Sequence, residues 1–174
     1  MQRRDFLLTA GRNVAAGVVA NGVIDSGYVC AGQTPRKIKV GQIGTAHAHA
    51  SGKMDALRKL TDHYEVVGVV EPDAALREAA RRQAAYRDLP WMSEEQLLST
   101  PGLQAVAVET SVRDLVPTAA RCVAAGMHLH LDKPAGPSLP AFKKVLDDAA
   151  SKKLTVQMGC MFRSHTGKKS STSS

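Results

Sequence analysis

Apolar residues in this chain occur in two alternating patterns, short continuous runs and the three-to-four-residue spacing of one helix face. The continuous runs predict strands at residues 38–44, 66–70, 104–109, 128–131 and 154–158. The helical spacing predicts helices at residues 51–63, 74–86, 115–125 and 140–153. Strands that alternate with amphipathic helices are typical of an α/β fold, here a doubly wound parallel sheet covered on both faces.

Polar residues and a glycine mark several boundaries of these segments. Asp73 can cap the helix that begins at residue 74, and Ser93 with Gln96 forms a capping-box pattern before a further, brief helix. Gly126 can end the helix at residues 115–125, and residues 89–92 have the pattern of a short connecting strand.

The first strand, helix and second strand form the most informative stretch. Gly44 ends the first strand, and Glu71 follows the second. In such a unit a pyrophosphate lies against the glycine turn and the helix N-terminus, where backbone N–H groups are unpaired, while a carboxylate accepts hydrogen bonds from the adenosine ribose. The stretch therefore predicts a dinucleotide site. We expect NAD rather than NADP, because Glu71 would repel a 2′-phosphate.

The glycine turn departs from the usual G-x-G-x-x-G pattern. Only Gly44 matches, since Ala46 and His49 stand at the second and third glycine positions. Ala46 adds a methyl group where the backbone approaches the pyrophosphate, and His49 is bulky where a small residue lets the helix pack on the strand. These departures favour an alternative, a non-enzymatic binding or interaction module on the same scaffold.

Composition and charge exclude other classes. A length of 174 residues with 44% apolar residues is enough for one domain with an ordinary core. The net charge of +7 arises mainly at the two ends of the chain, and aromatic residues make up 4%. We expect no nucleic-acid partner, because neither a basic stripe nor a stacking platform is visible. Cys30, Cys122 and Cys160 are too scattered to indicate a disulfide or metal framework.

Four histidines stand near predicted strands. His47 and His49 form an H-x-H pair, but no carboxylate or cysteine lies at ligand spacing. We therefore expect no metal site and assign both to phosphate contact or solvent. His128 and His130 point to one face of a short strand, which predicts packing or edge positions.

The two ends of the chain differ from the middle. Arg3 and Arg4 precede a mildly apolar stretch, which predicts a twin-arginine export signal over residues 1–31 and a periplasmic protein; without it the chain would be cytoplasmic. Arg12 and Asn13 interrupt the stretch, so no stable membrane span is expected. Residues 164–174 contain no aliphatic side chain, and we expect a disordered, truncated tail over residues 160–174 after a folded domain at residues 37–159.

Four short motifs together resemble a known family. They are Ile43-Gly44-Thr45, Val70-Glu71-Pro72-Asp73, Ala124-Ala125-Gly126-Met127-His128 and Leu131-Asp132-Lys133-Pro134-Ala135-Gly136. In order and spacing they resemble the N-terminal, Rossmann-type NAD(P)-binding domain of the glucose–fructose oxidoreductase and inositol dehydrogenase superfamily, Gfo/Idh/MocA. The resemblance extends over residues 37–163.

The resemblance implies roles for particular residues. Lys133 takes the place of the family's catalytic lysine beside the nicotinamide and the substrate oxygen, where an ammonium stabilises developing charge. Pro134 would shape the nicotinamide pocket, and Asp132 occupies the position of the family's glutamate. The implied cofactor-binding set is Gly44, Thr45, Ala46, His47, Glu71, Thr110, Asp132, Lys133 and Pro134. Asp114, Leu115 and Val116 stand where relatives often carry a histidine, so that contact is lost or altered.

In the family that these motifs resemble, a second domain follows the cofactor domain. We expect that this sequence does not extend into it. Relatives add an open antiparallel sheet with most substrate contacts and an acid–base pair, whereas this chain reaches Ser174 soon after a crossover-like segment at residues 156–163. We expect an NAD(P)-binding domain of oxidoreductase ancestry that is catalytically incomplete. Hydride transfer with a small sugar or polyol is then expected only of full-length relatives.

Export should require the arginine pair. Replacing Arg3 and Arg4 by Lys should strongly reduce transport of the chain to the periplasm in a fractionation assay, because the twin-arginine route recognises that pair. Unchanged export of the double variant would remove the signal from residues 1–31.

Overall fold

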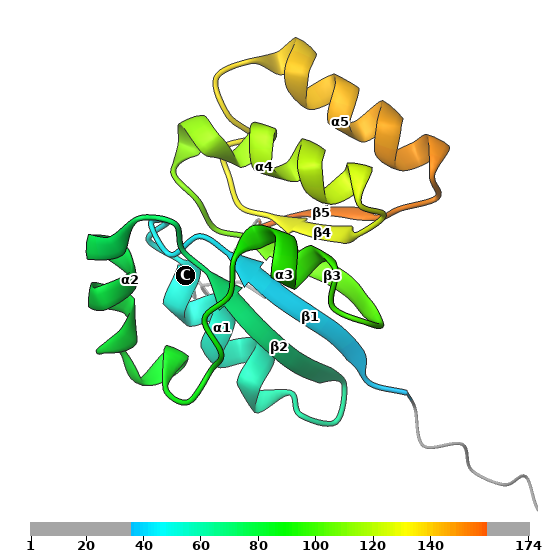
Figure 1. Cartoon of the computed structure of the whole chain (residues 1–174). Coiled ribbons are helices and arrows are strands. Elements are labelled where there is room, and N and C mark those ends of the chain that lie inside the picture. Colours follow the sequence, from blue (N-terminus) through cyan, green and yellow to red (C-terminus); the bar gives the residue numbers. More distant parts are fainter. Residues whose placement is uncertain (1–35, 160–174) are drawn as a thin grey trace, which may run out of the picture. The chain divides into compact units, whose positions relative to one another are not determined.

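The computed structural model describes residues 36–159, which form a five-stranded sheet with helices on both faces (Figure 1). The strands are β1 (Ile38–Ile43), β2 (Tyr64–Val70), β3 (Leu103–Val108), β4 (His128–Leu131) and β5 (Val156–Met158). Their order is β2-β1-β3-β4-β5, and every neighbouring pair is parallel. The predicted parallel α/β fold is confirmed. The expected export signal at residues 1–31 and the expected tail at residues 160–174 lie outside the described residues.

Helices connect consecutive strands. They are α1 (Ala50–Lys59), α2 (Ala74–Arg81), the 3₁₀ turn η1 (Ala84–Tyr86), α3 (Glu94–Leu98), α4 (Val112–Ala124) and α5 (Leu139–Ser151). The predicted boundary signals are present: Asp73 accepts from the Leu76 backbone, and Ser93 and Gln96 form the capping box. Gly126 adopts a positive φ of 83° after α4. In the described part of the chain no helix is both long and apolar enough to cross a bilayer.

Two hydrophobic cores pack on opposite faces of the sheet. The larger one joins α3, α4 and α5 to β1, β3 and β4 through residues such as Leu97, Leu115 and Val108. The smaller one joins α1, α2 and η1 to β2 through Met54, Val69, Ala80, Ala85 and Tyr86. Figure 1 shows α4 and α5 side by side over β4 and β5.

The face that carries α1 is covered only in part. A cavity of about 380 Å³ opens there beside β1, β3 and β4. Its walls include Leu57, Ala105, Ala107, His128 and His130. The expectation of a sheet covered on both faces therefore holds near β2 but not fully over β4.

Two helices are shorter in the structure than the sequence pattern predicts. Residues 74–86 do not form one helix, because Gln83 is extended and separates α2 from η1. This break allows the Tyr86 side chain to pack in the smaller core. The first helix ends at Lys59, with Leu60 outside helical geometry, rather than at residue 63.

The connecting strand predicted at residues 89–92 is a single bridge between Trp91 and Val69.

The turn after β1 requires glycine at position 44. Gly44 has a φ of 91°, and a Cβ at this position would lie 2.6 Å from the backbone nitrogen of Thr110. A side chain would therefore push the end of β1 away from the end of β3 as well as strain the backbone.

Substitution of two glycines should have opposite effects. Gly44→Ala should lower the free energy of unfolding by about 1–3 kcal/mol. Gly52→Ala, in α1 with no atom within 4 Å of the added methyl, should leave it unchanged or raise it by up to about 1 kcal/mol. Urea unfolding followed by the fluorescence of the single tryptophan measures both. Equal stability of the two variants would contradict the strain at Gly44.

Candidate functional site

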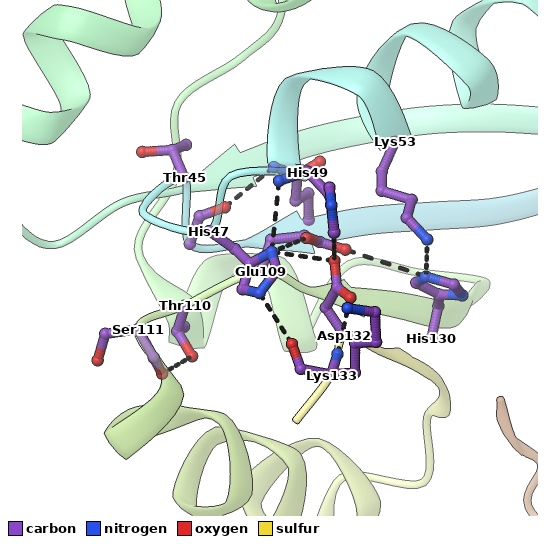
Figure 2. Close-up of polar contacts among 12 residues, drawn as sticks. Thr45, His47, His49, Lys53, Glu109, Thr110, Ser111, His130, Asp132 and Lys133 are labelled. Atoms are coloured by element: carbon purple, nitrogen blue, oxygen red, sulfur yellow. Dashed lines mark hydrogen bonds and ion pairs between the residues drawn. The ribbon is translucent and has the colours of Figure 1, made fainter. Parts of the chain in front are cut away.

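The carboxyl ends of four strands meet at one edge of the sheet. Gly44 follows β1, Glu71 follows β2, Glu109 follows β3 and Asp132 follows β4. Figure 2 shows the polar side chains that gather there from the strand ends and from the loop before α1. Ligands of open parallel sheets bind at this edge, where neighbouring connections diverge to opposite faces.

A buried glutamine, Gln42, holds the glycine turn through a hydrogen bond. Gln42 Nε2 donates to the carbonyl oxygen of Gly44 and to the hydroxyl of Tyr86, each at 2.9 Å. Burial raises the pKa of Tyr86 to about 12, so its hydroxyl stays neutral. No sequence motif marks either residue as part of the site, although a glutamine inside an apolar run is a signal of a buried hydrogen bond.

Glu71 joins the glycine turn to the end of β2. Its Oε2 accepts from the backbone nitrogen of Thr45 at 2.7 Å and from the Thr45 hydroxyl at 2.8 Å. Its Oε1 accepts from the backbone nitrogen of Asp73 at 3.1 Å. The carboxylate is therefore held in place before any ligand arrives.

Glu71 and Gly44 line the same cavity, which has a volume of about 390 Å³. Ala46, Thr110 and Ser111 belong to its wall, so four of the residues expected near a dinucleotide, Gly44, Ala46, Glu71 and Thr110, meet there. The first turn of α1 contains no acidic residue, so no side chain of that turn opposes the positive end of the helix dipole. The cavity therefore presents a carboxylate and the backbone of the turn that leads toward α1.

His47 and His49 lie against Asp132 rather than in solvent. The Nδ1 atoms of both rings are 3.0 Å from Asp132 Oδ2. His47 Nε2 lies 3.0 Å from the carbonyl oxygen of Lys133. The fold thus supplies a carboxylate that sequence spacing did not reveal, and the two histidines are not the isolated loop residues that the spacing indicated.

Glu109 adds a second carboxyl group to this cluster. It is fully buried at the end of β3, and neither carboxyl oxygen has a hydrogen-bond partner among the described residues. Burial, together with the nearby Asp132 carboxylate, raises the pKa of Glu109 to about 8. Burial opposes ionisation of Asp132 as well, but the hydrogen bonds from the Lys133 backbone and from His49 outweigh it and lower the pKa of Asp132.

The two histidines of β4 have different surroundings. His128 is exposed, and its Nδ1 accepts from the backbone nitrogen of Thr155 at 3.0 Å, but β4 lies between β3 and β5 and is not an edge strand. His130 Nε2 lies 2.7 Å from Lys53 Nζ and 4.0 Å from Glu109 Oε1. Burial and the Lys53 ammonium lower the pKa of His130, so the neutral ring accepts a hydrogen bond from Lys53. His130 is therefore part of the polar cluster and not only a packing residue.

Lys133 and Pro134 form an exposed loop at the margin of this cluster. The backbone nitrogen of Lys133 donates to Asp132 Oδ1 at 2.7 Å, and a cis peptide bond joins Lys133 to Pro134. The Lys133 side chain is exposed, so its ammonium is accessible to a ligand. Asp132 thereby contacts both the two histidines and the backbone of the lysine loop (Figure 2).

Solved structures share this fold at low sequence identity. A protein described as an oxidoreductase from Erwinia carotovora atroseptica SCRI1043 has a TM-score of 0.64 at 24% identity, over 71% of this chain and 36% of its own. The apo scyllo-inositol dehydrogenase from Lactobacillus casei has a TM-score of 0.60 at 16% identity, over 72% and 37%. An NAD-binding protein from Listeria innocua has a TM-score of 0.61 at 22% identity, over 71% of this chain and 35% of its own.

The chain thus spans little more than a third of the length of these structures. No curated protein matches it. The model of the Gfo/Idh/MocA oxidoreductase family, described by its NAD-binding Rossmann fold, matches residues 38–160. This match includes the glycine turn, the carboxylate after β2 and the Asp132-Lys133-Pro134 loop, and the chain belongs to the Gfo/Idh/MocA family as a carrier of its NAD-binding Rossmann domain.

Proposed function

We propose that this chain binds NAD at the carboxyl edge of the sheet, as the cofactor domain of an enzyme that transfers hydride to or from a sugar or polyol. The observation that carries the proposal is the placement of the Glu71 carboxylate and the Gly44 turn in the wall of one cavity. An inositol dehydrogenase among the structural neighbours supports the polyol class.

Within this cavity each end of the adenosine diphosphate has a partner. The pyrophosphate would lie at the Gly44 turn and toward the N-terminus of α1, where Ala46 would contribute backbone. The ribose would lie beside Glu71. Thr110 lies across the turn from Gly44, and it limits how closely the cofactor approaches the end of β3.

Preference for NAD over NADP follows from the anchoring of Glu71. Three donors hold its two oxygens in place, so the carboxylate cannot swing away from a 2′-phosphate without breaking hydrogen bonds. A ribose 2′-hydroxyl can instead donate to a remaining lone pair of the carboxylate. The 2′-phosphate would meet a fixed negative charge at short range.

Lys133 is the residue of this chain that we propose to act on the substrate oxygen. Its side chain is exposed, and its backbone is held by hydrogen bonds with Asp132 and His47. A lysine held in this way can stabilise the negative charge that develops on oxygen during hydride transfer. NAD, once bound, supplies the hydride acceptor.

Removing Glu71 should narrow the difference between the two cofactors. Glu71→Ala should weaken NAD binding, measured by calorimetry, by about tenfold, because it loses a charge-assisted hydrogen bond, and should weaken NADP less or not at all. Glu65→Ala, which removes an exposed carboxylate from the other end of β2, is the matched control and should change neither affinity. Tighter binding of NADP than of NAD by the unaltered chain would contradict the assignment.

The 174-residue chain should bind NAD without turning over sugars or polyols. The family resemblance places the acid–base pair in a second domain, and loss of such a group lowers rates by about 10²–10⁴. Formation of reduced cofactor is followed by absorbance with a panel that includes myo-inositol, scyllo-inositol and glucose. Robust turnover that disappears in Lys133→Ala would show that this chain is a sufficient enzyme.

A further inference from the structure

The cluster of His47, His49 and Asp132 has the spacing of metal ligands. One donor atom from each residue lies within 4.8 Å of the other two. Asp132 Oδ2 is 3.0 Å from both Nδ1 atoms. Ligands of a tetrahedral zinc ion, at bond lengths of about 2.0–2.1 Å, are about 3.4 Å apart. The observed spacing is therefore within a few tenths of an ångström of the tetrahedral one.

The surroundings of His47 orient its ring toward Asp132. A carbonyl oxygen can only accept, so His47 Nε2 donates to Lys133 O at 3.0 Å. This bond leaves Nδ1, the other ring nitrogen, facing Asp132 Oδ2 at 3.0 Å. Nδ1 is therefore the atom of His47 that would bind a metal ion beside the Asp132 carboxylate.

Glu109 provides independent support. This fully buried carboxyl group has no hydrogen-bond partner for either oxygen among residues 36–159, and its Oε2 lies 3.8 Å from His47 Nδ1. A buried polar group without a partner is destabilising, and more so if it is charged. A cation coordinated beside it would give the carboxyl group a partner and offset that cost.

We propose that His47, His49 and Asp132 bind one divalent transition-metal ion, with Glu109 as a further oxygen ligand from β3. Two imidazole nitrogens with carboxylate oxygens suit zinc, iron(II), cobalt(II) or manganese, whereas magnesium prefers oxygen ligands alone. The bond from His47 Nε2 to the Lys133 carbonyl is the outer hydrogen bond that commonly orients a metal-binding histidine.

The ion would also fix the loop that carries Lys133. Asp132 and His47, both proposed ligands, hold the backbone nitrogen and the carbonyl oxygen of Lys133 respectively. Binding of the metal would therefore order the lysine loop at the edge of the cofactor cavity. This proposal is independent of the proposed NAD binding, because the ion and the nucleotide are measured separately.

Zinc binding by the untagged 174-residue chain tests the proposal without nucleotide. Competition with a chromophoric chelator should give one zinc ion per chain, and excess magnesium should not displace it. His47→Ala and His49→Ala should each weaken zinc binding at least tenfold. His63→Ala, which removes an exposed histidine between α1 and β2, is the matched control and should bind like the unaltered chain. Equal affinity of all three variants, or no zinc bound, would overturn the proposal.

Cobalt(II) provides a second, spectroscopic readout. Its ligand-field spectrum in the unaltered chain should indicate nitrogen and oxygen ligands, and Glu109→Gln should change that spectrum. A thiolate charge-transfer band would place the metal on cysteine and overturn the assignment. Circular dichroism of each variant identifies loss of the fold, in which case the spectrum of the unaltered chain decides.

Discussion

Parallel pairing of β1 with both β2 and β3 is the constraint on which the site depends. It brings the carboxyl ends of the strands to one edge, where the backbone of Gly44 donates to Val70 and that of Glu109 donates to Ile43, each at 2.8 Å. The contact between the Gly44 turn and Thr110 leaves no space for a Cβ. Strain at this position would therefore disturb the cofactor turn, the Glu71 anchor and the polar cluster together.

Local sequence signals predicted most of the fold. Apolar runs and helix caps depend on neighbours in sequence, so the five strands, Asp73 and the capping box at Ser93 could be predicted. The break between α2 and η1 could not, because it depends on Tyr86 packing against Met54 and Val69 from other segments. Helical spacing continues through such a break, since tertiary burial decides where the helix stops.

Contacts of the candidate site were harder to predict than the residues in it. Gly44, Glu71 and Lys133 could be identified from motifs, whereas the contact between His49 and Asp132 joins residues 83 positions apart. Sequence patterns for metal ligands depend on short spacings along the chain, so they do not detect ligands that come from distant segments. The strand pattern nevertheless held a signal, because Glu109 and Asp132 follow predicted parallel strands and must share an edge with the loop after β1.

Electrostatics constrains the cluster of carboxyl groups and histidines at the ends of β3 and β4. Two carboxyl groups with no exposed side-chain surface lie next to each other, and burial of two such groups without compensation is unfavourable. The raised pKa of Glu109, about 8, reflects this cost and reduces the negative charge at neutral pH. Lys53 is close enough to stabilise negative charge on Glu109, yet its ammonium donates to His130. His47 Nδ1 lies closer to Asp132 Oδ2, at 3.0 Å, than to Glu109 Oε2, at 3.8 Å. The proposed cation would offset the negative charge that remains in the cluster.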